Sequence, residues 1–237
     1  MITDWRVFHV DETVSTNLDA VKGENGDVFS AGFQTAGRGR LDHKWFSPPG
    51  VNVLMSVVVG VGAIPPEELA TLPIVAGLAV ADCVEHLASA LPGEMKVKWP
   101  NDVLFSSRKV AGILCERRGD NVIVGIGVNV KEQEFPPDIR SASCYIGGRV
   151  EVDTVRDALL EVLKRYFNEW LESGFAVFLP RVAQRDFLKG SFVSVSQTDG
   201  DSSPVEGVCG GINDDGSLDV AGVKVYAGQA HIKIQRS

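Results

Sequence analysis

Cysteine is scarce in this sequence and is not placed as a metal site or a disulfide framework would require. Its 237 residues include Cys83, Cys115, Cys144 and Cys209, which lie far apart, with no C-x-x-C pair and no histidine at metal-ligand spacing. Such usage argues against a zinc site and favours a reducing compartment. The N-terminus also lacks the charged-then-apolar layout of a signal peptide. We therefore expect a cytoplasmic protein.

Long apolar runs are also missing. Residues 51–64 and 69–81 are short for a membrane span and are interrupted by Asn, Gly or Pro. Apolar residues make up 44% and charged residues 23% of the chain, which is ordinary for a globular protein and excludes a disordered chain. We expect no membrane contact.

Positive charge is in deficit, because 23 Lys and Arg face 31 Asp and Glu, a net charge of -8. A chain of this sign does not bind DNA or anionic lipid through its whole surface, so we expect no DNA partner. Two segments run against the trend: residues 37–45 carry +2 and residues 96–118 carry +4, which leaves -14 for the rest. A basic region inside an acidic protein suits a small anionic substrate such as ATP.

Three common catalytic signatures do not occur either. The sequence contains no G-x-x-x-x-G-K-[ST], H-E-x-x-H or G-x-S-x-G. P-loop NTPases, zincins and α/β-hydrolases therefore lack their usual sequence support.

Hydrophobic periodicity and turn residues predict a mixed α+β domain followed by a small β-rich unit. The expected strands are 7–10, 28–34, 51–59, 95–99, 109–116 and 121–130, and the expected helices are 16–22, 65–89, 153–173 and 175–187. After Gly190, short strands at 191–197, 204–212, 217–220 and 222–227 predict a small barrel. We divide the chain into domains 1–188 and 189–237.

The first candidate site is the long polar loop 35–50, since loops of this length in compact domains are usually functional. It contains Gly37-Arg38-Gly39-Arg40 and Lys44-Trp45. Glycines let a ligand approach the backbone, and arginines offer planar donors to carboxylate or phosphate. A solvated basic loop or an RNA-contacting patch explains this string equally well.

The second candidate is Lys96 to Asp102 together with Arg108 to Leu114. Of the six basic residues within 96–118, four are interpreted as exposed faces of strands: Lys96, Lys98, Arg117 and Arg118. Lys109 differs because it lies between a turn and an apolar strand, from which its side chain can reach into a pocket.

The third candidate combines Ser15-Thr16-Asn17 with Val124-Gly-Ile-Gly-Val-Asn129. Helix capping accounts for the first segment and a packed strand with two close approaches for the second. Neither segment indicates a function alone.

Taken together and in order, these segments resemble the biotin–protein ligases (biotin–acetyl-CoA-carboxylase ligases). The segments are Ser15-Thr-Asn17, Gln34-Thr-Ala-Gly-Arg-Gly-Arg40, Lys44-Trp-Phe-Ser-Pro48, Lys98-Trp-Pro-Asn-Asp102, Arg108-Lys-Val-Ala-Gly-Ile-Leu114 and Gly125-Ile-Gly-Val-Asn129. The resemblance covers nearly the whole chain. It implies an α+β catalytic domain of the biotin/lipoate ligase type, a C-terminal SH3-like β-barrel, and the monofunctional class without an N-terminal DNA-binding module.

The resemblance also implies the reaction and its partners. Biotin and ATP would form biotinyl-5′-AMP and pyrophosphate with Mg²⁺, and a lysine of the biotin carboxyl carrier protein would then accept biotin. A homodimer is expected by family analogy. Loop 37–50 would close over the ligand.

Site residues follow from the same resemblance. Biotin would contact Ser15, Thr16, Asn17, Gln34, Gly37, Arg38, Gly39, Arg40, Lys109, Gly112, Gly125 and Gly127. ATP would contact Arg38, Arg40, Trp45 (stacked on adenine), Asn101, Asp102, Lys109 and Asn129, with Asp102 also near Mg²⁺. Arg40 and Lys109 would be catalytic.

The loop departs from the family pattern at two positions. Asp42 and His43 stand where the family usually has Gly and Arg. The change removes a glycine with a freely adopted backbone conformation and one fixed positive charge. The resemblance therefore implies no specific ligand contact for His43.

Other functions remain as alternatives. Lipoate–protein ligase shares the fold and the acyl-adenylate chemistry, but Lys98-Trp-Pro-Asn-Asp102 and the short Gly-Arg-Gly-Arg loop favour biotin. An RNA-binding module fits poorly with the acidic balance. A ligase fold used only for binding or regulation is the third alternative.

Overall fold

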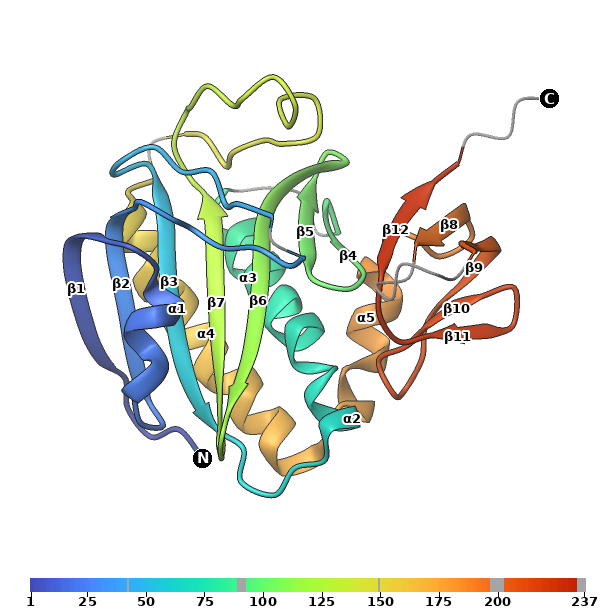
Figure 1. The fold of residues 1–237 in the computed structure, drawn as a ribbon, viewed down its shortest axis with the longest axis horizontal. Helices are drawn as coiled ribbons and strands as arrows, with labels where there is room; N and C mark the ends of the chain where they lie inside the picture. The colour runs from blue at the N-terminus through green and yellow to red at the C-terminus, as the bar shows by residue number, and fades with distance from the viewer. Residues whose placement is uncertain (42, 89–92, 149, 197–202, 234–237) are drawn as a thin grey trace.

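The computed structural model describes residues 1–41, 43–88, 93–148, 150–196 and 203–233. Its larger part is a seven-stranded sheet in the order β1-β2-β3-β7-β6-β5-β4, drawn in Figure 1. The strands are β1 (Arg6–Thr13), β2 (Asp27–Gln34), β3 (Asn52–Gly60), β4 (Met95–Lys98), β5 (Asp102–Phe105), β6 (Arg108–Arg118) and β7 (Asn121–Asn129). β1 runs parallel to β2, whereas the other neighbours are antiparallel. The predicted mixed α+β class is confirmed.

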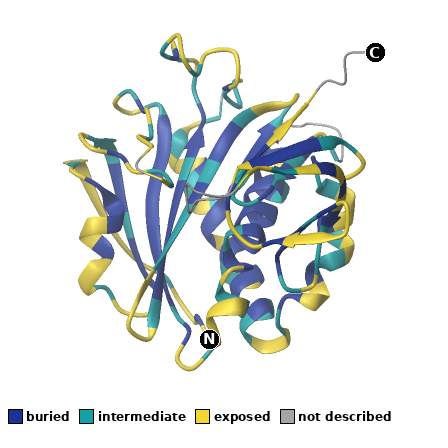
Figure 2. Cartoon of the chain, turned by 45° about the vertical axis from the view of Figure 1, so that its right-hand side comes forward, coloured by how far each residue is buried: buried dark blue, intermediate teal, exposed yellow. Residues whose placement is uncertain are grey.

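Two long helices pack on one face of this sheet, and the short helix α1 (Thr16–Asp19) with the 3-10 turn η1 (Ala20–Lys22) packs on the other (Figure 1). Helix α3 (Leu72–Leu87) is buried on almost every side, because it packs against β4, β5 and β6 of the sheet and against its neighbour α4 (Val152–Ser173). Helix α4 buries the apolar stripe that its 3.6-residue spacing predicts. Figure 2 shows the result: central strands and inner helices are dark blue, and the outer surfaces are yellow.

The helix expected at 65–89 is two helices, α2 (Pro66–Leu69) and α3. Pro73, the second residue of α3, has no N–H to continue the hydrogen-bond ladder of α2. Thr71 holds the corner: its hydroxyl donates to the Glu68 carbonyl at 2.6 Å and accepts the Trp170 indole N–H at 3.0 Å. The prediction of one continuous helix was therefore wrong at this point.

The apolar stretch in this region is longer than the run of residues 69–81 expected from the sequence. Among the described residues, Pro66–Leu87 is long and apolar enough to cross a bilayer by length and composition. The most apolar part of this segment is 78% buried within the fold, so the segment contributes to the core of the domain. The stretch extends the run expected at 69–81 at both ends, by α2 on one side and by the last residues of α3 on the other.

The C-terminal residues form a second, five-stranded sheet in the order β11-β10-β9-β8-β12. It is reached through η2 (Ala176–Phe178) and α5 (Leu179–Arg185), and its strands are β8 (Phe192–Ser196), β9 (Val205–Ile212), β10 (Leu218–Val220), β11 (Val223–Val225) and β12 (Gln229–Ile232). The four predicted strands are present. β12, which pairs with β8, was not predicted.

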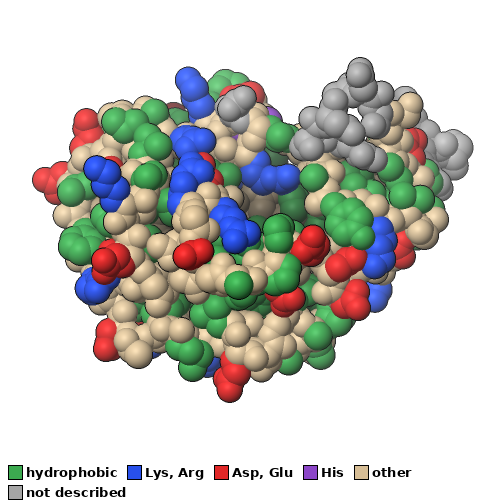
Figure 3. All heavy atoms as spheres, turned by 60° about the horizontal axis from the view of Figure 1, so that its bottom comes forward, with side chains coloured by type: hydrophobic (Ala, Val, Ile, Leu, Met, Phe, Trp, Pro, Cys, Tyr) green, Lys and Arg blue, Asp and Glu red, His purple; other side chains and the backbone are tan. Residues whose placement is uncertain are grey.

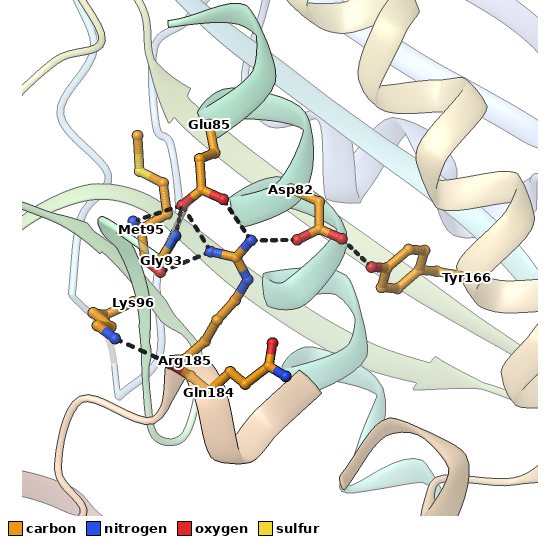
Figure 4. Close-up of polar contacts among 8 residues, drawn as sticks. All are labelled: Asp82, Glu85, Gly93, Met95, Lys96, Tyr166, Gln184 and Arg185. Atoms are coloured by element: carbon orange, nitrogen blue, oxygen red, sulfur yellow. Dashed lines mark hydrogen bonds and ion pairs between the residues drawn. The ribbon is translucent and has the colours of Figure 1, made fainter. Parts of the chain in front are cut away.

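A cluster of paired charges fixes α5 to the main domain (Figure 4). The Arg185 guanidinium contacts Asp82 at 2.6 Å and Glu85 at 2.7 Å, and it donates to the Met95 carbonyl at 2.9 Å. The Tyr166 hydroxyl donates to the other oxygen of Asp82. Burial works to raise the pKa of Glu85, but the hydrogen bonds from Arg185 and the Met95 N–H outweigh it and lower that pKa. We call these four side chains, Asp82, Glu85, Tyr166 and Arg185, the Arg185 cluster.

Candidate active site

A cavity of about 470 Å³ lies where loop 35–50 and the strands β5, β6 and β7 meet the C-terminal strand β12. This volume is in the usual range for small-molecule sites. All residues predicted to bind biotin or ATP line it except Gly37. In Figure 3, blue Lys and Arg side chains gather around a hollow in the upper middle of the view. The structure thus brings together segments that are spread over more than 200 residues.

Gly37 has a structural role in the loop. Its carbonyl accepts the Trp45 N–H at 3.0 Å, and the Gly39 N–H donates to the His43 carbonyl at 2.7 Å, so the loop folds back as a narrow hairpin. A Cβ at Gly37 would lie 2.8 Å from the Trp45 carbonyl oxygen, which is too close for another residue. Glycine at this position therefore lets the hairpin close.

The floor of the cavity is made by glycines under the Trp45 ring. A Cβ at Gly127 would overlap the indole, and one at Gly112 would lie 3.0 Å from it. The Lys109 ammonium lies 5.5 Å from the ring centroid, within cation–π range. The indole Nε1 is buried and has no hydrogen-bond partner among the described residues. Trp45 therefore presents an unpaired donor inside the cavity.

A β-bulge places Lys109 on the side of the sheet that faces the cavity. The β5–β6 register shifts between Val103 and Leu104, so that Leu104 pairs with Lys109 while Val103 pairs with Ala111. Without the bulge, Lys109 and Gly112 would point to opposite faces. With it, a Cβ at Gly112 would lie 3.1 Å from the Lys109 ammonium. Lys109 thus lies in the cavity lining.

Positive charge at this site exceeds the negative charge that faces it. Lys109 forms a 2.6 Å ion pair with Asp102, and Arg40 and Lys98 lie in the same lining. Burial lowers the pKa of Arg40 and of Lys98, and for Lys98 the neighbouring Lys109 lowers it further while Asp102 opposes the shift. The cluster of Arg40, Lys98 and Lys109 is called the pocket cations below.

Lys98 corrects an expectation, because the alternation of β4 had suggested an exposed strand face. In the structure Lys98 pairs with Asp102 across β4 and β5 and lies in the cavity lining. This face is half-buried by elements distant in sequence, which a local pattern cannot show. Arg117 and Arg118 are exposed as expected, and the Lys96 ammonium reaches the Gln184 carbonyl.

At its other end the cavity is lined by small polar groups. The Thr16 N–H donates to Gln34 Oε1 at 2.8 Å, and Ser56 Oγ lies 2.7 Å from Thr16 Oγ1 and 2.6 Å from Asn17 Oδ1. A Cβ at Gly125 would overlap the Asn17 amide, so this glycine admits Asn17. Sequence analysis missed Ser56, whose signal was a polar residue within the apolar run of β3.

Two asparagines of the cavity lining, Asn101 and Asn129, differ in the hydrogen bonds of their side chains. Asn101 donates through its side-chain amide to the Ile113 carbonyl at 2.7 Å and so holds the turn between β4 and β5. Asn129 donates to the Cys144 carbonyl at 2.9 Å, but its Oδ1 is buried without a partner among the described residues. Asn129 therefore offers a free acceptor to a ligand.

Part of the cavity wall comes from the C-terminal sheet, which sequence analysis did not include in the site. Gln229 and His231 of β12 line the cavity, and the Arg40 guanidinium donates to the Gly228 carbonyl at 3.3 Å. The Gln229 amide lies 3.5 Å from the His43 ring. Position 43, where the loop departs from the family pattern, thus faces the C-terminal sheet. Asp42 lies outside the described residues.

The donor set does not fit a metal held by the protein alone. No group of three or more His, Cys, Asp or Glu side chains with metal-site geometry occurs among the described residues. Asp102 is the carboxylate in the cavity lining, and its Oδ1 already pairs with Lys109. The predicted contact of Asp102 with Mg²⁺ stays a prediction.

Comparison with known proteins agrees with this geometry. The sequence model of the biotin/lipoate A/B protein ligase family matches residues 10–131. The chain belongs to this family. It is 35% identical to the biotin–[acetyl-CoA-carboxylase] ligase of Mycobacterium tuberculosis, over 94% of this chain and 88% of that protein. It is 32% identical to the enzyme of the same name from Paracoccus denitrificans, over 89% and 92%.

The fold agrees as well. The solved structure of biotin protein ligase from Aquifex aeolicus in complex with biotin and ATP superimposes with a TM-score of 0.81 at 26% identity. The match covers 96% of this chain and 98% of that one, so it includes the small C-terminal sheet. The family resemblance stated from the sequence motifs is confirmed.

Proposed function

We propose that this family member is an ATP-dependent biotin–protein ligase. The observation that carries the proposal is one cavity with two unlike ends: the pocket cations at one end and the small polar groups around Thr16 at the other. Such a cavity matches a ligand with a polar ring at one end and a carboxylate at the other. Biotin has this form, with a cyclic urea and a valerate carboxylate.

In the first step, a carboxylate oxygen of biotin attacks the α-phosphorus of ATP. The new O–P bond forms as the bond from that phosphorus to the bridging oxygen breaks, and the electron pair leaves with pyrophosphate. Arg40 and Lys109 hold the two anions together and stabilise the charge of the transition state, and Lys98 adds a third cation. Arg40 is directed by its bond to the Gly228 carbonyl.

In the second step, the amine of an acceptor lysine attacks the carbonyl carbon of biotinyl-5′-AMP. A C–N bond forms, the C–O bond to AMP breaks, and the amine loses a proton. Water must be kept from the mixed anhydride, and the hairpin of loop 35–50 lies where it can cover the cavity. The acceptor is proposed to be the biotin carboxyl carrier protein.

Further parts of the proposal concern the whole molecule. The five C-terminal strands would close as an SH3-like barrel, with the domain boundary at residues 188–189, and limited proteolysis would cut there first. A homodimer, which light scattering would detect, and a cytoplasmic location are also proposed. Net charge -8 supports the absence of duplex DNA binding, which a gel shift at physiological salt would test.

The polar end of the cavity also favours biotin over lipoate. The dithiolane ring of lipoate has no N–H or carbonyl group to pair with the Thr16, Asn17 and Gln34 side chains of the lining, and a polar wall without a polar partner is costly. Purified protein should release pyrophosphate from ATP with biotin and not with lipoate. Equal turnover with lipoate would overturn the assignment.

A further inference from the structure

Glu116, on β6, lies outside the cavity lining, next to the lining residues Asn17 and Arg38. Its side chain is 16% exposed, and it faces three donors. Oε2 accepts the Asn17 side-chain N–H at 2.8 Å, whereas Oε1 lies 3.2 Å from the Arg118 guanidinium and 3.3 Å from that of Arg38. Arg38 also lies 3.4 Å from Oε2, so it contacts both oxygens, whereas Arg118 contacts Oε1 and the Asn17 amide contacts Oε2.

The carboxylate fixes which way round the Asn17 amide lies. A carboxylate can only accept, so the Asn17 nitrogen faces Glu116 and its oxygen faces Ser56 at 2.6 Å. The absence of a side chain at Gly125 gives the amide the space to lie there. The amide is therefore held at both ends.

The orientation of Asn17 then determines to which atoms the Ser56 and Thr16 hydroxyls donate. Ser56 has one proton, and Asn17 Oδ1 can only accept, so Ser56 donates to Asn17. Ser56 then has lone pairs free for the Thr16 hydroxyl, 2.7 Å away, and Gln34 Oε1 is a second acceptor for Thr16 at 3.2 Å. The Thr16 proton therefore has an acceptor within the protein, which leaves a lone pair of Thr16 Oγ1 to accept from a ligand.

We propose that Glu116 is a positioning residue which, through Asn17 and Ser56, makes Thr16 an acceptor for a ureido N–H of biotin. The proposal rests on the proposed function, since it names the ligand group that the relay selects. A ligand with a donor N–H in the ring fits this polarity, and a ring without one does not.

Glu116→Gln tests the relay with almost no change of shape. The arginines favour the carbonyl oxygen of the new amide at the Oε1 position, so its nitrogen faces Asn17. Asn17 then turns its amide around, Ser56 donates to Thr16, and the ureido N–H meets a weakened acceptor. We expect KM for biotin to rise roughly tenfold, the scale of one buried hydrogen bond, with kcat at saturating biotin and KM for ATP within about twofold.

A matched double variant separates the relay from the loss of charge. In Asn17→Asp/Glu116→Gln, the new amide nitrogen at position 116 donates to one oxygen of the new carboxylate at position 17. Ser56 donates to the other oxygen of that carboxylate, so the original polarity returns at the same net charge. We expect KM for biotin to return to within about threefold of the wild type. Arg118→Ala, which removes a partner of Glu116 outside the cavity, should leave KM for biotin unchanged.

The outcomes are distinct. A KM unchanged in Glu116→Gln, or raised but not restored in the double variant, overturns the relay. Wild-type protein without biotin-dependent pyrophosphate release overturns the proposed function instead. Thermal unfolding of each variant identifies any loss of fold. If Glu116→Gln does not fold, the double variant alone still tests the relay, because a biotin KM more than about threefold above the wild type would refute it.

Discussion

The Arg185 cluster and the pocket cations each gather charged side chains inside the fold, and they differ in how those charges are paired. Arg185 has two carboxylates and a carbonyl as partners, and its pKa is raised, chiefly by its hydrogen bond to Glu85. Arg40 and Lys98 lie near one carboxylate, which Lys109 already occupies, and burial lowers the pKa of both. The first cluster is complete without a ligand, whereas the second is not.

The difference shows where each cluster gains its stabilisation. A buried ion pair offsets the cost of removing charge from water, so the Arg185 cluster supports the junction between α5 and the main domain. Cations without such partners are stabilised when an anionic ligand arrives, which is typical of a binding site. The free Trp45 Nε1 and Asn129 Oδ1 follow the same pattern. Incomplete pairing is thus the feature that distinguishes the site.

The largest expected effect is a loss of stability when the Arg185 cluster is broken. Arg185→Ala leaves Asp82 and Glu85 half-buried without their cation, so the free energy of unfolding should fall by about 3 kcal/mol or more. Denaturant unfolding measures this. The folded fraction should keep its KM for biotin, and Arg156→Ala, which removes exposed pairs on α4, should cost less than about 1 kcal/mol. Equal losses in the two variants would contradict a structural role for the cluster.

Breaking the pocket cations should instead reduce activity more than stability. Lys109→Ala removes no core volume, and Arg40 and Lys98 remain as cations near Asp102, so stability should change less than in Arg185→Ala. Biotin-dependent pyrophosphate release should fall roughly 100-fold, the scale of one electrostatic stabiliser of a transition state. Arg108→Ala, one residue earlier and exposed, is the matched control and should be much milder. If Lys109→Ala stays within a few-fold of the wild type, the site geometry proposed above is wrong.

A smaller effect follows from pH. The pKa of Glu85 is lowered in the folded state, so its contribution to stability is complete above its ordinary pKa and is lost as pH falls through the folded-state pKa. Unfolding curves between neutral pH and about pH 3 should therefore show a steeper acid loss in the wild type than in Glu85→Gln. Parallel curves for the two proteins would show that Glu85 does not contribute to the loss of stability in acid.

The smallest expected effect concerns the loop that covers the incomplete cluster. Amides of loop 35–50 should exchange with deuterium faster in the free protein than with biotinyl-5′-AMP bound, because ligand contacts hold the hairpin over the cavity. Amides of α3 near the Arg185 cluster should not change. Equally slow exchange of the loop in both states would argue against closure.

The sequence by itself determined the features that depend on near neighbours. The spacing of apolar residues predicted α4, the turn before an apolar strand singled out Lys109, and six ordered motifs identified the family. These succeed because helix periodicity, turn chemistry and glycine at a close approach are local properties.

Only the tertiary structure decided which distant groups meet. The β5–β6 bulge turned Lys109 toward Gly112, coverage of β4 made Lys98 a pocket residue, and β12 brought Gln229 opposite His43. The link from Glu116 to Asn17 joins residues 99 positions apart. Burial and pairing of this kind depend on what packs across a strand, and no local pattern in the chain records it.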